Sequence, residues 1–165
     1  MRSRRQFLST LGFVGLACSP VAKAQQQTRV WRVGYLTAGS PVSVLGRTYL
    51  DAFRLKLREL GYIEGRNLIV DVKGTEEDFS VLPTMAAELV AMHPDVIVAG
   101  ATLAVSAVQR ATSSIPIVMG PTADPIGSGF IKSLAKPGGK ITGVSLMSMD
   151  LSAKSLEFLT SASPC

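Results

Sequence analysis

The hydrophobic pattern of this chain switches repeatedly between two periods from Val30 onward, and this switching limits the folds that it can adopt. Short apolar runs of strand character alternate with segments whose apolar residues recur every three or four positions, about five times in all. Such alternation predicts an α/β fold, a three-layer sandwich with a mostly parallel five-stranded sheet. We expect the flavodoxin-like strand order 2-1-3-4-5. The second strand should lie at an edge, because Asp71 is a polar residue in its interior.

The expected strands occupy 31–36, 67–73, 95–99, 115–119 and 141–145. The expected helices occupy 45–60, 80–92, 103–111, 126–134 and 151–159. The stripe that the first helix should bury consists of Leu50, Phe53, Leu57 and Leu60. We expect Gly61 to stop that helix in a left-handed conformation, with Tyr62 folding back on Leu57. Ser80 is expected to cap the second helix, with Pro83 tolerated in its first turn.

Residues 1–24 have the composition of a cleavable export signal, with a basic start, an apolar stretch and a small-residue triplet before Gln25. The apolar stretch has about a dozen residues, whereas a membrane-spanning helix needs ~20. The segment Ser3-Arg4-Arg5-Gln6-Phe7-Leu8 resembles the twin-arginine signal read by the export machinery, and a general secretory signal is the alternative. Either route predicts a periplasmic or otherwise extracytoplasmic protein. We expect cleavage after Ala24, with lipidation at Cys18 as the alternative.

The positive charge of the chain is concentrated in this signal. The whole sequence has 17 Lys+Arg against 12 Asp+Glu, and four of the basic residues but no acid lie in 1–24, which leaves 13 against 12. No basic cluster with interleaved aromatic residues remains, so nucleic acid is not expected as a partner. Because Cys18 lies in the signal and Cys165 is the last residue, the mature chain cannot close an internal disulfide.

Catalytic and cofactor motifs are missing from the sequence. It contains no Gly-x-Ser-x-Gly elbow, no phosphate-binding loop that ends in Gly-Lys-Ser/Thr and no Gly-x-Gly-x-x-Gly after the first strand. His93 is the single histidine and is interpreted as a helix-end residue, while the acidic run 75–78 is interpreted as a solvated loop. We therefore expect no catalytic residues, no metal, no cofactor and no enzymatic activity.

The candidate binding residues follow from the expected topology. In open parallel sheets, ligands bind at the carboxyl ends of the strands, where turns present backbone N–H groups and helix N-termini. Three turns there provide the candidate residues Gly39, Ser40, Ala101, Thr102, Pro121, Thr122 and Asp124. The hydroxyls of Ser40, Thr102 and Thr122 could either cap helices or bind a small solute. Asp124 could receive a ligand cation or cap its own helix.

A series of motifs also matches one known pattern in order. They occupy 33–36, 57–67, 82–83, 87–90, 95–99, 115–118, 124–125 and 134–145. The last, Leu-Ala-Lys-Pro-Gly-Gly-Lys-Ile-Thr-Gly-Val-Ser, is the specific one. Together they resemble the solute-binding proteins of ABC transporters, in the family that includes tryptophan/tyrosine-type binding proteins with the type I periplasmic fold. The resemblance extends over about residues 30–158.

This resemblance implies two α/β lobes that close on a small, amino-acid-like solute, aromatic amino acids among the candidates, and deliver it to a membrane permease. It also implies that the helix N-terminus after Thr102 holds a carboxylate and that Asp124 meets an ammonium group. The family pattern dissolves around Thr160, so we expect 25–165 to be the N-terminal lobe, with the second lobe absent and binding weak. Two alternatives stay open, a small exported α/β enzyme and the ligand-binding lobe of a sensor.

Overall fold

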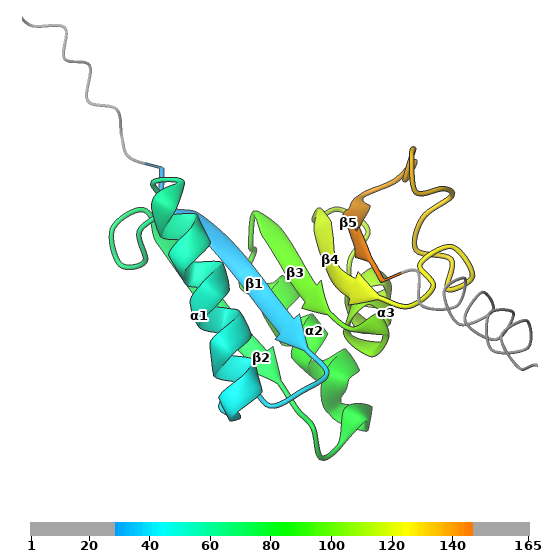
Figure 1. Cartoon of the computed structure of the whole chain (residues 1–165), viewed down its shortest axis with the longest axis horizontal. Coiled ribbons are helices and arrows are strands. Elements are labelled where there is room, and N and C mark those ends of the chain that lie inside the picture. Colours follow the sequence, from blue (N-terminus) through cyan, green and yellow to red (C-terminus); the bar gives the residue numbers. More distant parts are fainter. Residues whose placement is uncertain (1–28, 147–165) are drawn as a thin grey trace, which may run out of the picture.

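The computed structural model describes residues 29–146 (Figure 1). The expected signal at 1–24, including Cys18, and the expected last helix at 151–159 lie outside the described residues. Within 29–146, no helix combines the length and the apolar character needed to cross a membrane.

A single five-stranded sheet forms the centre of the fold. Its strands are β1 (Trp31–Thr37), β2 (Leu68–Gly74), β3 (Val96–Gly100), β4 (Ile117–Thr122) and β5 (Ile141–Ser145). They lie in the order β2-β1-β3-β4-β5, and every pairing between them is parallel. The predicted strand order and the edge position of the second strand are confirmed. Asp71, the polar residue inside β2, accepts a hydrogen bond from Arg32 Nε of β1 at 2.6 Å.

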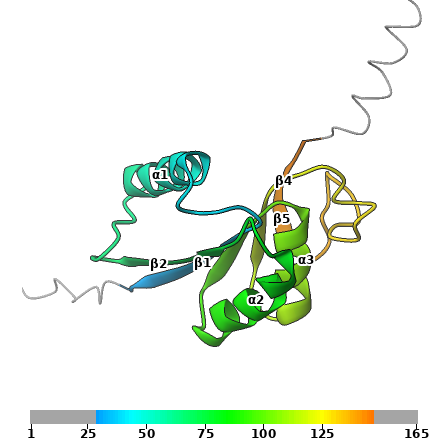
Figure 2. The same cartoon turned by 90° about the horizontal axis from the view of Figure 1, so that it is seen from below.

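Helices cover both faces of this sheet, which gives the three predicted layers (Figure 2). Helix α1 (Val44–Glu59) lies on one face, and α2 (Leu82–Ala91) and α3 (Thr102–Ala111) lie on the other. A short 3₁₀ turn, η1 (Phe79–Val81), precedes α2. These bounds differ from the expected ones by one to two residues at most ends, where helices fray and strands lose their pairing.

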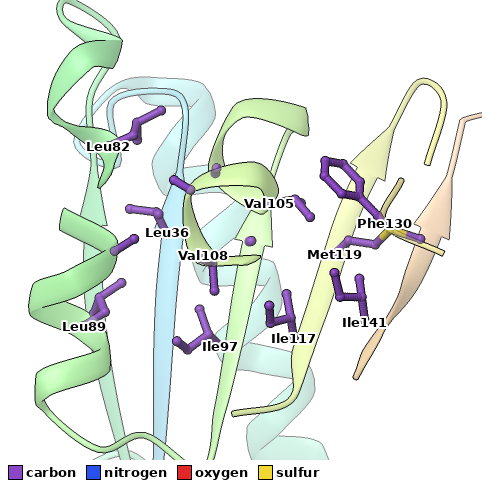
Figure 3. Packing of buried hydrophobic residues seen from close by; sticks show 14 of the residues in the cluster. Leu36, Leu82, Leu89, Ile97, Val105, Val108, Ile117, Met119, Phe130 and Ile141 are labelled. Atoms are coloured by element: carbon purple, nitrogen blue, oxygen red, sulfur yellow. The ribbon is translucent and has the colours of Figure 1, made fainter. Parts of the chain in front are cut away.

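The main hydrophobic core lies between the sheet and the helices α2 and α3 (Figure 3). Isoleucines 97, 117 and 141 are register partners across three neighbouring strands and point to this side. Leu36 of β1, Leu89 of α2 and Val108 of α3 are completely buried there. Burial of a Leu or Ile side chain contributes about 1.5–3 kcal/mol, so this cluster provides the largest stabilisation of the fold.

Helix α1 packs less deeply against its face. Of the four residues in its predicted stripe, only Leu50 is buried, Phe53 and Leu57 are half-buried, and Leu60 is 65% exposed. The expected stop is confirmed, because Gly61 has a φ of 88° and the N–H of Tyr62 donates to the carbonyl of Leu57 at 2.9 Å. The helix therefore ends as its sequence predicts, but much of its apolar surface stays accessible.

The predicted helix at 126–134 is wrong, because this segment forms a series of turns between β4 and β5. The carboxylate of Asp124 accepts the N–H of Gly127 at 2.7 Å, and a Cβ at Gly127 would lie 2.0 Å from that carboxylate. Gly129 then takes a left-handed φ of 72°. The turns still bury Phe130 and Ile131, which explains why the apolar spacing resembled that of a helix.

The predicted cap of the second helix is also wrong in detail. Asp78, not Ser80, caps this region, because its side chain accepts the N–H of Ser80 at 2.8 Å and starts η1. Pro83 lies in the first turn of α2, as expected. The helix ends before His93, which is exposed and has a φ of 52°, so the interpretation of His93 as a helix-end residue is confirmed.

Candidate functional site

The carboxyl ends of β1, β3 and β4 open into a cleft on the side of the sheet that carries α1. Strand alternation sends Tyr35 and Thr37 to this side, opposite the main core. Two depressions lie here, and both are lined by Tyr35, Thr37 and Tyr49, so they form two arms of one cleft. Tyr49 reaches the cleft from α1, whereas Tyr35 and Thr37 belong to β1.

The first arm, of about 210 Å³, lies between the turn after β1 and the start of α1. Besides the shared residues, it is lined by Ala38, Gly39, Ser40, Pro41, Ser43, Leu45, Gly46 and Glu76. Ser43 fixes this turn, because its hydroxyl donates to the carbonyl of Ser40 at 2.8 Å and accepts the N–H of Gly46 at 3.1 Å. A Cβ at Gly46 would lie 2.1 Å from the carbonyl oxygen of Ser40, so only glycine allows this close approach.

The second arm, of about 370 Å³, lies over the ends of β3 and β4. Its further lining residues are Val98, Gly100, Ala101, Gly120 and Pro121. Gly100 and Gly120 lie side by side, since a Cβ at Gly120 would lie 3.3 Å from the Cα of Gly100. Because these two positions have no side chains, the arm has a shallow apolar floor.

Four hydroxyl groups in the cleft have no hydrogen-bond partner among the residues that the structure describes. They belong to Tyr35, Thr37, Ser40 and Tyr49. Burial raises the pKa of the Tyr35 phenol above its ordinary value, so this group keeps its proton at neutral pH and can donate a hydrogen bond. The Tyr35 ring is held in place by the Phe53 ring of α1, whose centroid lies 5.6 Å away.

The structure brings four of the seven predicted site residues to this cleft. Gly39 and Ser40 line the first arm, and Ala101 and Pro121 line the second. Ala101 precedes α3 with a φ of 72° and makes no side-chain cap, so the backbone at the start of α3 lies beside the cleft.

The other three predicted residues do not line either arm. Thr102 is the first residue of α3 and is half-buried. Thr122 is buried, and its hydroxyl lies 3.7 Å from the sulfur of Met119. Asp124 is exposed and accepts the N–H of Gly127. Ser43, which the sequence analysis did not single out, caps α1 in place of Ser40.

Sequence reasoning missed Tyr35, Tyr49 and Glu76 as lining residues. Glu76 belongs to the acidic loop after β2, which comes next to the first turn because β1 and β2 are parallel neighbours. The N–H of Ser40 donates to its carboxylate at 3.4 Å, a long contact. Tyr49 could have been noticed in the sequence as an aromatic residue outside the buried stripe of its helix.

The cleft combines hydroxyls, aromatic faces, one carboxylate and a glycine floor, which are features of a small-molecule binding site. Over residues 29–146, no group of three or more His, Cys, Asp or Glu residues is placed to hold a metal ion. The carboxylate of Glu76 contacts the backbone N–H of Ser40, and within the described part of the chain no hydrogen bond pairs it with a lining hydroxyl that it could activate. The arrangement can bind a solute through contacts but does not provide a catalytic constellation.

A comparison with protein families decides the assignment. The model of the ABC transporter substrate-binding protein family matches residues 48–165, more than half of the chain. The chain belongs to this family. Its members bind a substrate and are not enzymes, which agrees with the expectation from the sequence and removes the exported-enzyme alternative.

Individual proteins that are similar to this chain agree with the family assignment. Over 109 residues, the chain is 35% identical to a tyrosine-binding protein of Clostridioides difficile (strain R20291), a match that covers 66% of this chain and 31% of that protein. It is also similar to an ABC domain from Streptococcus pneumoniae solved in complex with L-Trp, with 34% identity, a TM-score of 0.64 and coverage of 70% of this chain and 38% of that one.

A third relative was solved without ligand. It is the open structure of a substrate-binding protein with adhesive properties from Clostridium difficile, with 26% identity, a TM-score of 0.65 and coverage of 79% of this chain and 43% of that one. The family member described here therefore spans between about a third and two fifths of the length of these relatives. Its α/β fold matches one lobe of a periplasmic binding protein, as the sequence predicted.

Proposed function

We propose that this protein is the extracytoplasmic solute-binding component of an ABC uptake transporter, and that it captures an aromatic amino acid for delivery to a membrane permease. The observation that carries the proposal is the likeness to a structure in complex with L-Trp, at 34% identity and a TM-score of 0.64. The tyrosine-binding relative supports the same class of solute. Export through the signal at 1–24 is part of the proposal and is supported by the twin-arginine pattern.

The lobe described here would provide one wall of the binding site. This division is supported by the coverage of the relatives, of which the chain spans 31–43%. Closure of two walls on a solute is a shift of population toward the closed state, driven by contacts that exist only in that state. One wall makes only part of these contacts, so the proposal includes weak binding by this lobe.

The backbone groups of the cleft are suited to the main-chain part of an amino acid. The N–H groups of the turn at Gly39 and Ser40 and of the first turn of α3, which begins at Thr102, lie at the cleft and beside it. A helix N-terminus and free backbone N–H groups favour a carboxylate. We therefore assign the carboxylate of the solute to the α3 N-terminus, with Thr102 and Ala101 as its nearest residues.

Nuclear magnetic resonance tests this proposal on the chain itself. The ¹⁵N-labelled protein is titrated with L-tryptophan and L-tyrosine, with L-aspartate as a control solute without an aromatic ring. The expected result is a saturable change in the amide shifts at 38–40 and 100–103 with the aromatic solutes, and a dissociation constant well above the micromolar range. No saturable change, or changes confined to the amino-terminal edge of the sheet near Asp95, would contradict the function. A submicromolar constant would contradict the proposal that this lobe makes only part of the contacts to the solute.

A further inference from the structure

We propose that Glu76, in the first arm of the cleft, receives the ammonium group of an aromatic amino acid, and that Tyr49 holds its ring over the glycine floor of the second arm. The inference rests on the proposed function and adds the residues that contact the ammonium group and the ring of the solute. It also replaces Asp124 by Glu76 as the partner of the ammonium group.

Glu76 is the single acidic residue among those that line either arm. Within the described part of the chain its carboxylate forms no ion pair, and its recorded contact is the long one from the Ser40 N–H, at 3.4 Å. Of the acidic side chains that do form ion pairs, none lines the cleft. A carboxylate without a cation at the mouth of a depression provides the charge that an ammonium group requires.

Asp124 is placed differently. Its carboxylate already accepts the Gly127 N–H at 2.7 Å, in the turn that follows β4. It lines neither arm of the cleft. Asp124 therefore lies away from the cleft, whereas Glu76 lines its first arm.

Tyr49 is well placed to hold a ring. It is 61% exposed, although it lies on the side of α1 next to the cleft and lines both arms. The larger arm that it lines also contains Val98, Gly100 and Gly120, so a planar apolar group there would lose water on both sides. Tyr35 adds a second aromatic edge, held in place by Phe53. Aromatic side chains prefer offset or edge-to-face contacts with such groups.

Two solutes distinguish the ammonium contact of Glu76 from the ring contact of Tyr49. L-tryptophan and indole-3-propionate share the ring and the carboxylate, but the second has no ammonium group. Binding of both to the full chain is followed by the amide shifts of 38–40 and 100–103. We expect the unmodified protein to bind L-tryptophan about tenfold more tightly than indole-3-propionate, since a charge-assisted contact at an exposed site contributes at the low end of its range.

Glu76→Gln should remove most of this preference by weakening L-tryptophan about tenfold while leaving indole-3-propionate unchanged. Two matched controls are Glu77→Gln, which changes the neighbouring acid outside the cleft, and Asp124→Asn, which keeps an oxygen for the Gly127 N–H. Both controls should retain the preference. A preference that survives Glu76→Gln, or that is lost in Asp124→Asn instead, would overturn the assignment of the ammonium group.

Tyr49→Ala should weaken both solutes by the same factor, about tenfold, and leave their ratio unchanged, because both carry the ring. Tyr49→Phe keeps the aromatic face and should restore binding, and Leu55→Ala, exposed on the same helix outside the cleft, should have no effect. Equal binding by the Tyr49→Ala variant would overturn the ring assignment. Absence of binding by the unmodified chain to L-tryptophan and L-tyrosine alike would overturn the proposed function itself, which distinguishes the two failures.

Discussion

At the amino-terminal ends of the strands, away from the cleft, the carboxylate of Asp95 is held by two arginines. Asp95 precedes β3 and accepts the backbone N–H of Arg32 at 2.8 Å, as well as a hydrogen bond from the guanidinium of Arg29. Arg29 in turn lies over the ring of Trp31, 3.9 Å from its centroid. The Arg32 N–H is the main reason that the pKa of the Asp95 carboxyl lies below its ordinary value, and Arg29 adds to this effect.

A prediction at this scale concerns the pH dependence of stability. A carboxyl whose pKa is depressed in the folded state stabilises that state above its unfolded pKa, and the effect is lost as the pH falls through the folded pKa. Asp95→Asn should therefore lower the free energy of unfolding by about 1 kcal/mol at pH 7. The difference should shrink as the pH falls below the ordinary carboxyl pKa of about 4, and it should be lost once the pH is below the depressed pKa of the folded state. Urea denaturation at pH 7 and pH 3 measures both values; a difference that is the same at both pH values would contradict this role.

Residue-scale reasoning also explains which neighbours at the site the sequence does not predict. The acidic residues 76–78 are exposed, as expected of a solvated loop, but their pattern does not mark Glu76 as a neighbour of the turn after β1. Its position beside Ser40 depends on the pairing of β1 with β2, which a linear pattern does not contain. The sequence predicts Thr122 as an available hydroxyl, whereas the structure places it in the interior against Met119.

At the scale of single elements, α1 begins with a local device that also shapes the cleft. Ser43 accepts the Gly46 N–H and donates to the Ser40 carbonyl, so the helix cap and the turn after β1 are held by one hydroxyl. The helix has no acidic residue in its first turn to add to this cap, and Lys56 and Arg58 lie in its last turn, where they favour the negative end of the helix.

Replacement of this cap gives a second prediction. Ser43→Ala should destabilise the fold by about 1 kcal/mol, because the Gly46 N–H loses its acceptor. Ser43→Thr keeps the hydroxyl and should retain most of the stability. Equilibrium urea denaturation compares the two variants. Equal unfolding midpoints for Ser43→Ala and the unmodified protein would show that solvent replaces the cap without cost.

At the scale of the whole molecule, the two faces of the sheet are unequally stabilised. The face with α2 and α3 carries the continuous core, whereas the face with α1 buries few residues of that helix and opens into the cleft. Elements that bury little apolar surface open at a lower free energy than core elements do. We therefore expect the face that carries the cleft to be the less stable of the two.

Two measurements test this difference in stability between the two faces of the sheet. Leu89→Ala, in the core, should lower the free energy of unfolding by about 3 kcal/mol, whereas Leu60→Ala, at the exposed end of α1, should change it by no more than ~0.5 kcal/mol. Native-state hydrogen exchange should show lower protection in α1 than in α2 and α3. Similar protection in all three helices would contradict the proposed difference between the faces.

The sequence by itself determined the layered α/β architecture, the order of the strands and the carboxyl-terminal end of α1. These features follow from local signals in the sequence. The signals are the hydrophobic period, the glycine at the end of α1 and the polar residue in β2, and the structure shows the feature that each of them predicts. The motif at 134–145 and its companions also indicated the family, which the comparison confirmed.

Only the tertiary structure decided which residues meet at the cleft. Tyr49, Glu76 and Gly120 come from three different elements or loops, and parallel pairing with its crossover helices brings them around the ends of the strands. The same holds for 126–134, where the left-handed Gly129 breaks the segment into turns and Phe130 and Ile131 are buried in the core that the sheet and helices provide. Local propensity fixes an element when its own residues provide all the contacts, and it fails where a distant strand or a neighbouring side chain provides the contact instead.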